Sequence, residues 1–238
     1  MFFKGINFII GAAALGVALM AAAPSYAVAI TGTSTGSFSN ITSCGGGDCD
    51  ITGSGNSILK WGSDRSYQNL HNPSTLTANT VNINANTNAN DVTIGKLTWY
   101  NSATLDSQTP DSFGVDYKLS ITFTSPLGSL PVSQTFDLTI INTNNPQGDK
   151  IGAFTLVDLN SLVFNLPGVT VSDLHYSTDS HSSITNGVWY NKEGKTATLY
   201  ILADFKTSTD RVPEPATLSL MGAGLVGLAA RKRRKSKQ

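Results

Sequence analysis

The sequence predicts an all-β protein, an antiparallel β-sandwich of the jelly-roll type, with one helical segment at each end of the chain. Two observations predict the sandwich: apolar residues recur at every second position in several short runs, and turn residues separate these runs. A third is that no stretch between the terminal segments has the spacing of an amphipathic helix. The 238 residues suffice for one ordinary domain, which we expect to span residues 28–211.

Alternation is clearest between Phe113 and Thr124. One set of alternate positions in this run is apolar and includes Val115, Tyr117 and Leu119, and the other set is polar. Because successive side chains of a strand point to opposite faces, the run predicts a strand with one dry and one wet face. Further strands are expected over residues 56–62, 92–100, 132–141, 154–164, 168–176, 186–190 and 195–206.

The charge of the predicted body argues against nucleic acid as a partner. The whole chain is formally neutral, but six of its sixteen basic residues lie in the last eight positions. From Val28 to Val212 there are nine Lys and Arg against fifteen Asp and Glu, a net charge of −6. Such a body disfavours contact with a phosphate backbone.

The N-terminal segment, residues 1–27, has the three parts of a secretory signal peptide. Lys4 supplies the positive charge, an apolar run extends from Ile9 to Ala23, and Ser25-Tyr26-Ala27 forms an A-x-A-like cleavage site. We expect cleavage after Ala27, with a second possible cut after Ala29. The alternative is an uncleaved N-terminal anchor, which Pro24 and the small residues disfavour.

Export also bears on the two cysteines, Cys44 and Cys49, in the stretch SCGGGDCD. In an oxidising compartment two nearby thiols usually pair, so we expect a disulfide that closes this Gly-rich turn. A structural zinc ion needs four ligands, and the pair supplies two. A calcium loop of the EF-hand type is disfavoured because Leu59 stands where its bidentate Glu belongs. We therefore expect no metal and no cofactor.

No catalytic motif is present, and we expect no enzymatic activity. The histidines are His71, His175 and His181, and the chain has no G-x-S-x-G, H-E-x-x-H or Walker sequence around which a site could form. Glu193 is the only glutamate of the body, so a glycoside hydrolase would have to draw its two carboxylates mainly from Asp residues in turns.

An Asn-rich segment has six asparagines between Asn79 and Asn90. It could form a polar ladder that hydrogen-bonds a sugar, but a solvated edge strand or loop is the favoured interpretation.

Three short motifs follow one another near the start of the body: G-x-F-x-N, then G-x-G-x-N, then Trp-Gly. Their residues are Gly36, Phe38, Asn40, Gly53, Gly55, Asn56, Trp61 and Gly62, followed later by Gly95, Leu97, Trp99 and Asn101 and by the stretch FDLTIINTNN. This order resembles the choice-of-anchor K domain over residues 36–205, although here the Gly-rich loop contains Cys44 and Cys49. The resemblance implies an extracellular β-rich domain that occurs with varied surface-anchoring signals, without known catalysis or ligand.

The C-terminal segment, residues 212–238, joins three parts in a fixed order. Pro213-Glu214-Pro215 comes first, then an apolar stretch from Ala216 to Ala230, then a basic cluster composed of Arg231, Lys232, Arg233, Arg234 and Lys235. The segment resembles the PEP-CTERM sorting signal. Fifteen apolar residues form a short membrane helix, since a stable span needs about 20, and the basic cluster favours the cytoplasmic side.

The resemblance implies a partner, exosortase, a membrane protease or transpeptidase of bacteria that produce exopolysaccharide. The tail would then be an address that is removed, much as a GPI signal is. The chain would be exported through the inner membrane, anchored there transiently and released to the cell surface or extracellular matrix. A permanent anchor is the alternative, and a DNA-binding tail is disfavoured because the apolar block would hold it at the membrane.

The sequence as a whole therefore predicts a non-enzymatic surface or matrix protein of exopolysaccharide and biofilm. The alternatives are a carbohydrate-binding module and a cryptic glycan hydrolase. Sugar rings stack on aromatic side chains, for which the candidates are Trp99, Tyr100, Trp189 and Tyr190. Strand alternation leaves only one residue of each adjacent pair on the wet face.

Overall fold

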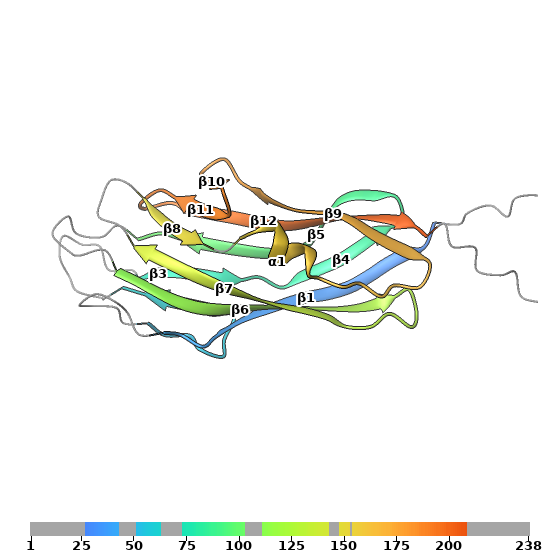
Figure 1. The fold of residues 1–238 in the computed structure, drawn as a ribbon, viewed down its shortest axis with the longest axis horizontal. Coiled ribbons are helices and arrows are strands. Elements are labelled where there is room, and N and C mark those ends of the chain that lie inside the picture. The colour runs from blue at the N-terminus through green and yellow to red at the C-terminus, as the bar shows by residue number, and fades with distance from the viewer. Residues whose placement is uncertain are drawn as a thin grey trace, which may run out of the picture.

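The computed structural model describes residues 27–42, 51–62, 73–102, 111–142, 148–152 and 154–208. Two antiparallel β-sheets lie face to face in an elongated sandwich (Figure 1). The strands are β1 (Ala29–Ser39), β2 (Ile58–Trp61), β3 (Ser74–Ala78), β4 (Val81–Asn86), β5 (Ala89–Tyr100), β6 (Asp111–Ser125), β7 (Val132–Asn142), β8 (Asp149–Gly152), β9 (Val169–Thr178), β10 (Ser182–Thr185), β11 (Val188–Asn191) and β12 (Thr196–Thr207). The described residues contain one helix, α1 (Leu156–Asn160).

One sheet has seven strands in the order β10-β11-β8-β7-β6-β1-β4, and the other has five in the order β2-β3-β5-β12-β9. The chain crosses between the sheets repeatedly, among other places at the tight turn between β4 and β5. The predicted all-β fold and its two antiparallel layers are therefore confirmed. In the seven-stranded sheet β6, β7 and β8 form a meander, and the jelly-roll type stays a prediction.

The inner faces of both sheets form one hydrophobic core. Strand β6 shows the predicted alternation: Val115, Tyr117 and Leu119 are buried, whereas Lys118 is exposed. Strand β12 does the same with Ala197, Leu199 and Ile201, all fully buried. Period-two sequence patterns thus identify the core face of the long strands.

Strand β1 lies between β4 and β6, and its inward positions are occupied by Ile30, Gly32, Ser34, Gly36 and Phe38. A Cβ atom at Gly36 would lie 2.6 Å from the Tyr117 ring and 2.8 Å from Ala78 Cβ. Glycine is therefore required where the large Tyr117 side chain from the neighbouring strand fills the interior.

One strand prediction is wrong. Residues 154–164 were expected to be extended, but they contain α1 and an irregular segment. Thr155 caps the helix: its Oγ1 accepts a hydrogen bond from the Asp158 amide at 3.2 Å and donates to the Asp158 carboxylate. This pair resembles a capping box, and it satisfies the Asp158 amide, one of the helix-start amides that a strand would have paired with a neighbour.

The Asn-rich segment forms β4, an edge strand of the seven-stranded sheet. Asn82, Asn84 and Asn86 are exposed, while Ile83 between them is buried. The favoured interpretation of this segment as a solvated edge strand is confirmed.

Several predictions concern residues outside the described ranges. These are the signal helix up to residue 26, the disulfide between Cys44 and Cys49, and the C-terminal helix. Among the described residues, no helix has the length and apolar character of a membrane span.

Stability should depend most on the aromatic residues between the sheets. Replacing Trp99 with Ala removes a fully buried ring and should lower the free energy of unfolding by about 3–5 kcal/mol. Tyr100→Ala is the matched control, because the next residue along β5 points outward and is half-buried. Urea unfolding followed by circular dichroism measures both, and equal losses would contradict the assigned faces of β5.

Candidate functional site

Both ends of the described body lie at the same end of the sandwich, where β1 begins and β12 ends (Figure 1). The turn between β4 and β5 holds them together: the Thr87 amide donates to the Val28 carbonyl, and the Asn88 amide donates to the Phe205 carbonyl. The Ser208 amide donates to the Gly168 carbonyl at 2.9 Å, so the chain leaves the body beside the start of β9. We call this end the terminal pole; it comprises residues 28–29, 87–88, 126–131, 166–168 and 208.

The predicted cleavage residue, Ala27, is exposed and precedes β1 by two positions. A cut after Ala27 leaves β1 whole. A cut after Ala29 would remove a strand residue whose carbonyl accepts a hydrogen bond from Ser125 Oγ at 2.7 Å. The geometry therefore favours Ala27 over the second position.

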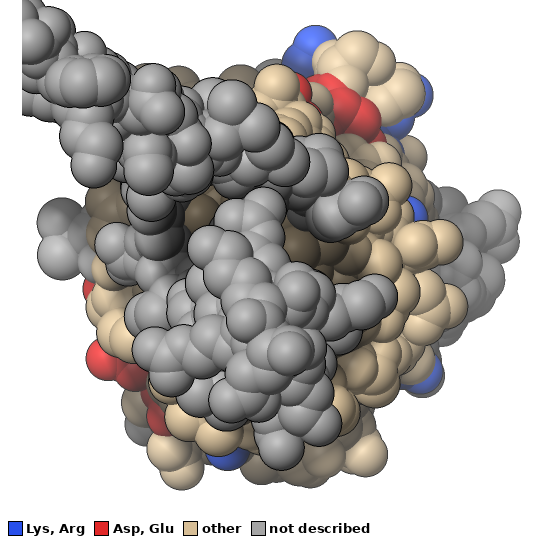
Figure 2. All heavy atoms as spheres, turned by 90° about the vertical axis from the view of Figure 1, so that its right-hand side faces the viewer, with Lys and Arg blue, Asp and Glu red and all other residues tan. Residues whose placement is uncertain are grey.

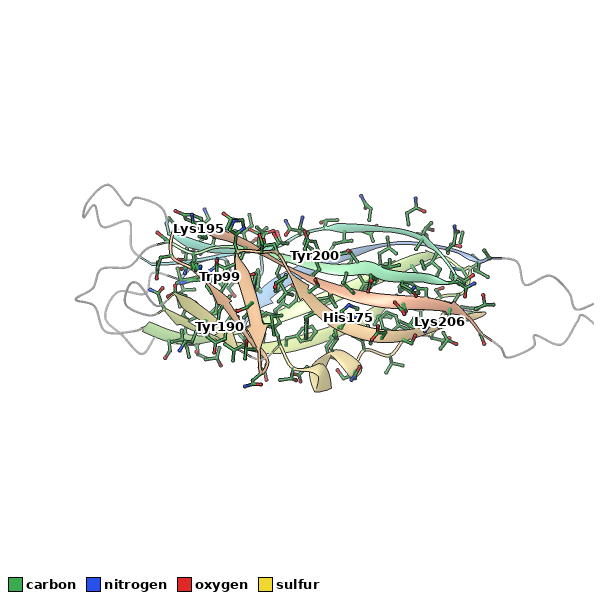
Figure 3. The ribbon with its side chains drawn as sticks, turned by 90° about the horizontal axis from the view of Figure 1, so that it is seen from above. Trp99, His175, Tyr190, Lys195, Tyr200 and Lys206 are labelled. Carbon is green, nitrogen blue, oxygen red and sulfur yellow. The ribbon has the colours of Figure 1, made fainter. Side chains whose placement is uncertain are left out.

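Near the terminal pole, the outer face of the five-stranded sheet has a charge cluster, a group of acidic side chains with Lys206 and the imidazole of His175 beside them. His175 Nε2 lies 3.3 Å from Asp91 Oδ1, and His175 Nδ1 lies 2.8 Å from the Asp173 carbonyl oxygen. The Asp91 amide donates to Asp204 Oδ1 at 3.0 Å, and Lys206 Nζ is 3.7 Å from Asp204 Oδ2. Figure 3 shows His175 and Lys206 toward the same end of the sheet. These contacts fix the start of β5 against β9 and β12.

The four aromatic candidates for sugar stacking separate as predicted. Trp99 and Trp189 are fully buried, and their ring centroids are 5.2 Å apart inside the sandwich. Tyr100 and Tyr190 are half-buried on outer faces. One residue of each pair is therefore available to a ligand, which confirms the expectation from alternation.

Tyr190 borders an open hollow of about 390 Å³ at β10 and β11. His181, Ser183 and Lys192 also line it, so an aromatic ring lies beside hydroxyl, imidazole and ammonium groups. Lys150 Nζ is 5.9 Å from the centre of the Tyr190 ring and covers one of its faces. The hollow combines one ring with several hydrogen-bonding groups, which is the composition of a site for a polar ligand.

A second hollow, of about 520 Å³, runs beside β9, the edge strand of the five-stranded sheet. Residues of 160–164 form one wall and residues of 169–174 the other. Its walls combine apolar side chains, among them the exposed Val163, with polar ones such as Thr170 and Asp173.

Sequence analysis missed a pair of carboxylates, Asp116 on β6 and Asp137 on β7, which face each other across the outer surface of the seven-stranded sheet. Asn40 Nδ2 donates to Asp116 Oδ2 at 2.5 Å. A hydrogen bond with Asp116, together with its charge, raises the pKa of Asp137 above the ordinary carboxyl value. Each residue occupies a solvent-facing position of its strand, but only the register between β6 and β7 places the two side chains opposite each other.

No catalytic or metal-binding residue was predicted, and the two histidines in the described residues lie at different places. His175 belongs to the charge cluster and His181 to the hollow beside Tyr190, while His71 lies outside the described ranges. No group of three His, Cys, Asp or Glu side chains in the described part is arranged to hold a metal ion.

Residues 211–234 match the family model of the PEP-CTERM protein-sorting motif. The match begins three positions after Ser208, where the described body ends, and it includes Pro213, Glu214 and Pro215 as well as Arg231 to Arg234. No curated protein and no solved structure matches the chain. The motif implies an exported protein that is processed by an exosortase and anchored transiently in the membrane.

The carboxylate pair predicts a pH-dependent stability. Because the pKa of Asp137 is raised in the folded state, folding binds protons above the ordinary carboxyl pKa, and stability falls as the pH rises through this window. Asp137→Asn removes the repulsion between like charges in directly opposite positions, so it should raise the urea midpoint at pH 7.

At a pH below the ordinary carboxyl pKa, Asp137 is protonated and carries no charge that repels Asp116, so the gain should vanish. Asp137→Glu is the control: it keeps the negative charge, so the urea midpoint should not rise. A gain of the same size at both pH values would show that the repulsion is not its cause.

Proposed function

We propose that the chain is a non-enzymatic protein of the cell surface or extracellular matrix, delivered by exosortase sorting and associated with exopolysaccharide or biofilm. The observation that carries the proposal is the PEP-CTERM motif at residues 211–234, which follows directly on a single folded sandwich. The body supports a scaffold role: a continuous core occupies its interior, and the largest aromatic side chains are used for packing.

The tail works in three steps in this proposal. The apolar stretch from Ala216 to Ala230 halts the chain in the membrane, and the basic cluster from Arg231 to Lys235 keeps the C-terminus on the cytoplasmic side. Fifteen residues are short for a permanent span, which favours a transient one. Pro213-Glu214-Pro215 then lies at the outer surface in an extended form, because proline fixes φ and lacks an amide donor. Exosortase would cleave there and release the body.

The remaining segments have corresponding roles. The signal peptide of residues 1–27 directs export, and the disulfide between Cys44 and Cys49 closes a turn of the exported body. We also propose that the body is of the choice-of-anchor K kind, although the comparisons lend this no support. Two motifs of that resemblance do meet: the Phe38 amide donates to the Asn56 carbonyl, and the Gly55 amide donates to the Phe38 carbonyl.

The sorting proposal is tested by changing each part of the tail separately. Replacing Pro213, Glu214 and Pro215 with Ala should leave export and membrane arrest intact but block processing, so that full-length protein accumulates in the inner membrane. Neutralising Arg231 to Lys235 should instead weaken arrest, since the charge bias that orients the short span is lost.

Immunoblots of membrane and surface fractions, from hosts with and without the exosortase, separate the two defects. Two results together would identify the segment as a simple anchor. The wild-type chain would keep its C-terminal residues in the exosortase-bearing host, and the triple-Ala variant would fractionate identically.

A second candidate function, binding of a polysaccharide as a carbohydrate-binding module, is favoured by the hollow beside Tyr190. The ring, the hydroxyl groups and the imidazole at this hollow would contact a sugar. Because the body carries a net charge of −6, the ligand would be a neutral polysaccharide rather than a polyanion. A cryptic glycan hydrolase would need two carboxylates about 5 Å or more apart, and the hydrogen-bonded pair of Asp116 and Asp137 lies closer than that.

Affinity electrophoresis in gels that contain neutral or anionic polysaccharide tests this second function. Weak retardation by a neutral polysaccharide is expected, and Tyr190→Ala should abolish it because the ring at the hollow is lost. Tyr100→Ala, on the outer face of the other sheet, is the control and should be retarded like the wild type. Tight binding of alginate in low salt would contradict the expected charge preference, and release of sugar that depends on Asp116 or Asp137 would establish hydrolysis.

A further inference from the structure

The terminal pole has an exposed apolar loop. Residues 126–131, between β6 and β7, read PLGSLP, and within them Leu127 is 93% exposed and Leu130 is 56% exposed. These are two of the four large apolar side chains that are exposed in the described part of the chain. A third is Val163. Two residues further along the chain, the Asn165 carbonyl accepts a hydrogen bond from the Leu130 amide of the loop. Exposed apolar groups are therefore concentrated at one end of the sandwich.

The loop lies beside both ends of the described body. Ser125, immediately before the loop, donates its hydroxyl hydrogen to the Ala29 carbonyl at the start of β1. On the other side, the α-carbon of Gly128 faces Pro167: a Cβ atom there would be 3.7 Å from Pro167 Cγ. Pro167 precedes Gly168, the residue whose carbonyl binds the Ser208 amide where the chain leaves the body. The apolar loop and the exit of the sorting segment thus share the terminal pole.

A short connection limits how far the terminal pole can lie from the membrane. Four residues lie between Ser208 and Pro213, which makes five residue-to-residue steps, and a fully extended chain spans at most about 3.3–3.6 Å for each step. If Pro213 is held at the outer surface of the membrane, Ser208 lies within roughly 17 Å of it. The pole from which the tail emerges therefore lies close to the lipid.

The segments that form this pole carry no charge that would oppose contact with lipid. No charged residue occurs from residue 119 to residue 136, which includes the whole loop, or from residue 159 to residue 172. Figure 2 views this end directly: around the grey atoms the visible surface is mostly uncharged, and the charged groups lie toward its rim. Leu favours transfer into a bilayer, and an uncharged surrounding avoids the cost of removing charges from water.

We propose that the terminal pole is a membrane-docking surface, with Leu127 and Leu130 inserted into the outer lipid interface while the tail anchors the chain. The inference rests on the proposed anchoring by residues 211–234. Docking sets the sandwich upright on the membrane and holds Pro213-Glu214-Pro215 at a fixed height above the bilayer. The partner is the lipid surface, and the loop can reach it because it lies at the end of the sandwich from which the short tether leaves the body (Figure 1).

Tryptophan fluorescence can test the contact because the three native tryptophans are buried, each at most 2% exposed. Leu127→Trp places a new indole at the loop. Ile58→Trp, on β2 in a position that is 42% exposed, is the matched control away from the terminal pole. Each variant, with its C-terminal segment present, is reconstituted into vesicles of phosphatidylethanolamine and phosphatidylglycerol in which the acyl chains are brominated. Both changes are at exposed positions, and far-ultraviolet circular dichroism verifies the fold.

The expected result is quenching by the brominated chains that is several-fold stronger for Leu127→Trp than for Ile58→Trp. Flotation of the same samples reports anchoring by the tail independently of the loop. Flotation with equal quenching of the two variants would overturn docking and leave anchoring intact, whereas failure to float would overturn both. Emission of Leu127→Trp that shifts to the blue with protein concentration, without quenching by lipid, would show that a second copy of the chain covers the loop and would also overturn the proposal.

Discussion

The fold depends on a layer of aromatic side chains that joins the two sheets along the length of the sandwich. At one end Trp99 of the five-stranded sheet meets Trp189 of the seven-stranded sheet, with ring centroids 5.2 Å apart at an angle of 70°. Toward the terminal pole Phe205 and Phe123 make a similar edge-to-face contact at 6.3 Å. Aromatic pairs of this kind add about 0.5–1.5 kcal/mol to the burial of their surface. These contacts set the spacing of the sheets, and they also withdraw the largest rings from any ligand.

The consequences of this layer are visible on the strands that surround it. Tyr117 needs the space that Gly36 leaves open on β1, and it stacks on Phe136 of β7 with centroids 5.7 Å apart. Burial raises the pKa of the Tyr117 hydroxyl well above its usual value, so this ring stays neutral. The outer faces are left with tyrosines such as Tyr190 and Tyr200, each with a lysine ammonium group beside its ring.

Much of the fold could be predicted because the long strands present an uninterrupted period of two. The pattern of β6, β7 and β12 is sufficient to assign their inner faces. It fails for β1, since glycine and serine occupy inward positions, and the space at Gly36 is limited by Tyr117 on another strand. It also fails for β10, where Ile184 is the one apolar residue among Ser182, Ser183 and Thr185, although Asn186 and Gly187 that follow, with φ of 51° and 75°, are typical of a hairpin turn. At 154–164 the local Thr155–Asp158 pairing outweighs the apolar alternation.

The candidate sites also differ in how far they can be predicted from the sequence. The sorting motif depends on contiguous residues, so it can be identified without a fold. The pair of Asp116 and Asp137 and the apolar terminal pole both join residues that are distant in the chain. Their existence follows from strand register and from which turns share an end of the sandwich, and neither property can be read from periodicity.

The position of the two chain ends makes the sandwich a transferable module. Val28 and Phe205 are held by consecutive residues of one turn, Thr87 and Asn88, so the polypeptide enters and leaves the fold at neighbouring points. A domain with adjacent ends can be spliced into a loop of a host protein without stretching either partner. Evolution or design can therefore exchange the peptides on both flanks, or circularise the body through a short linker, while every strand pairing stays in place.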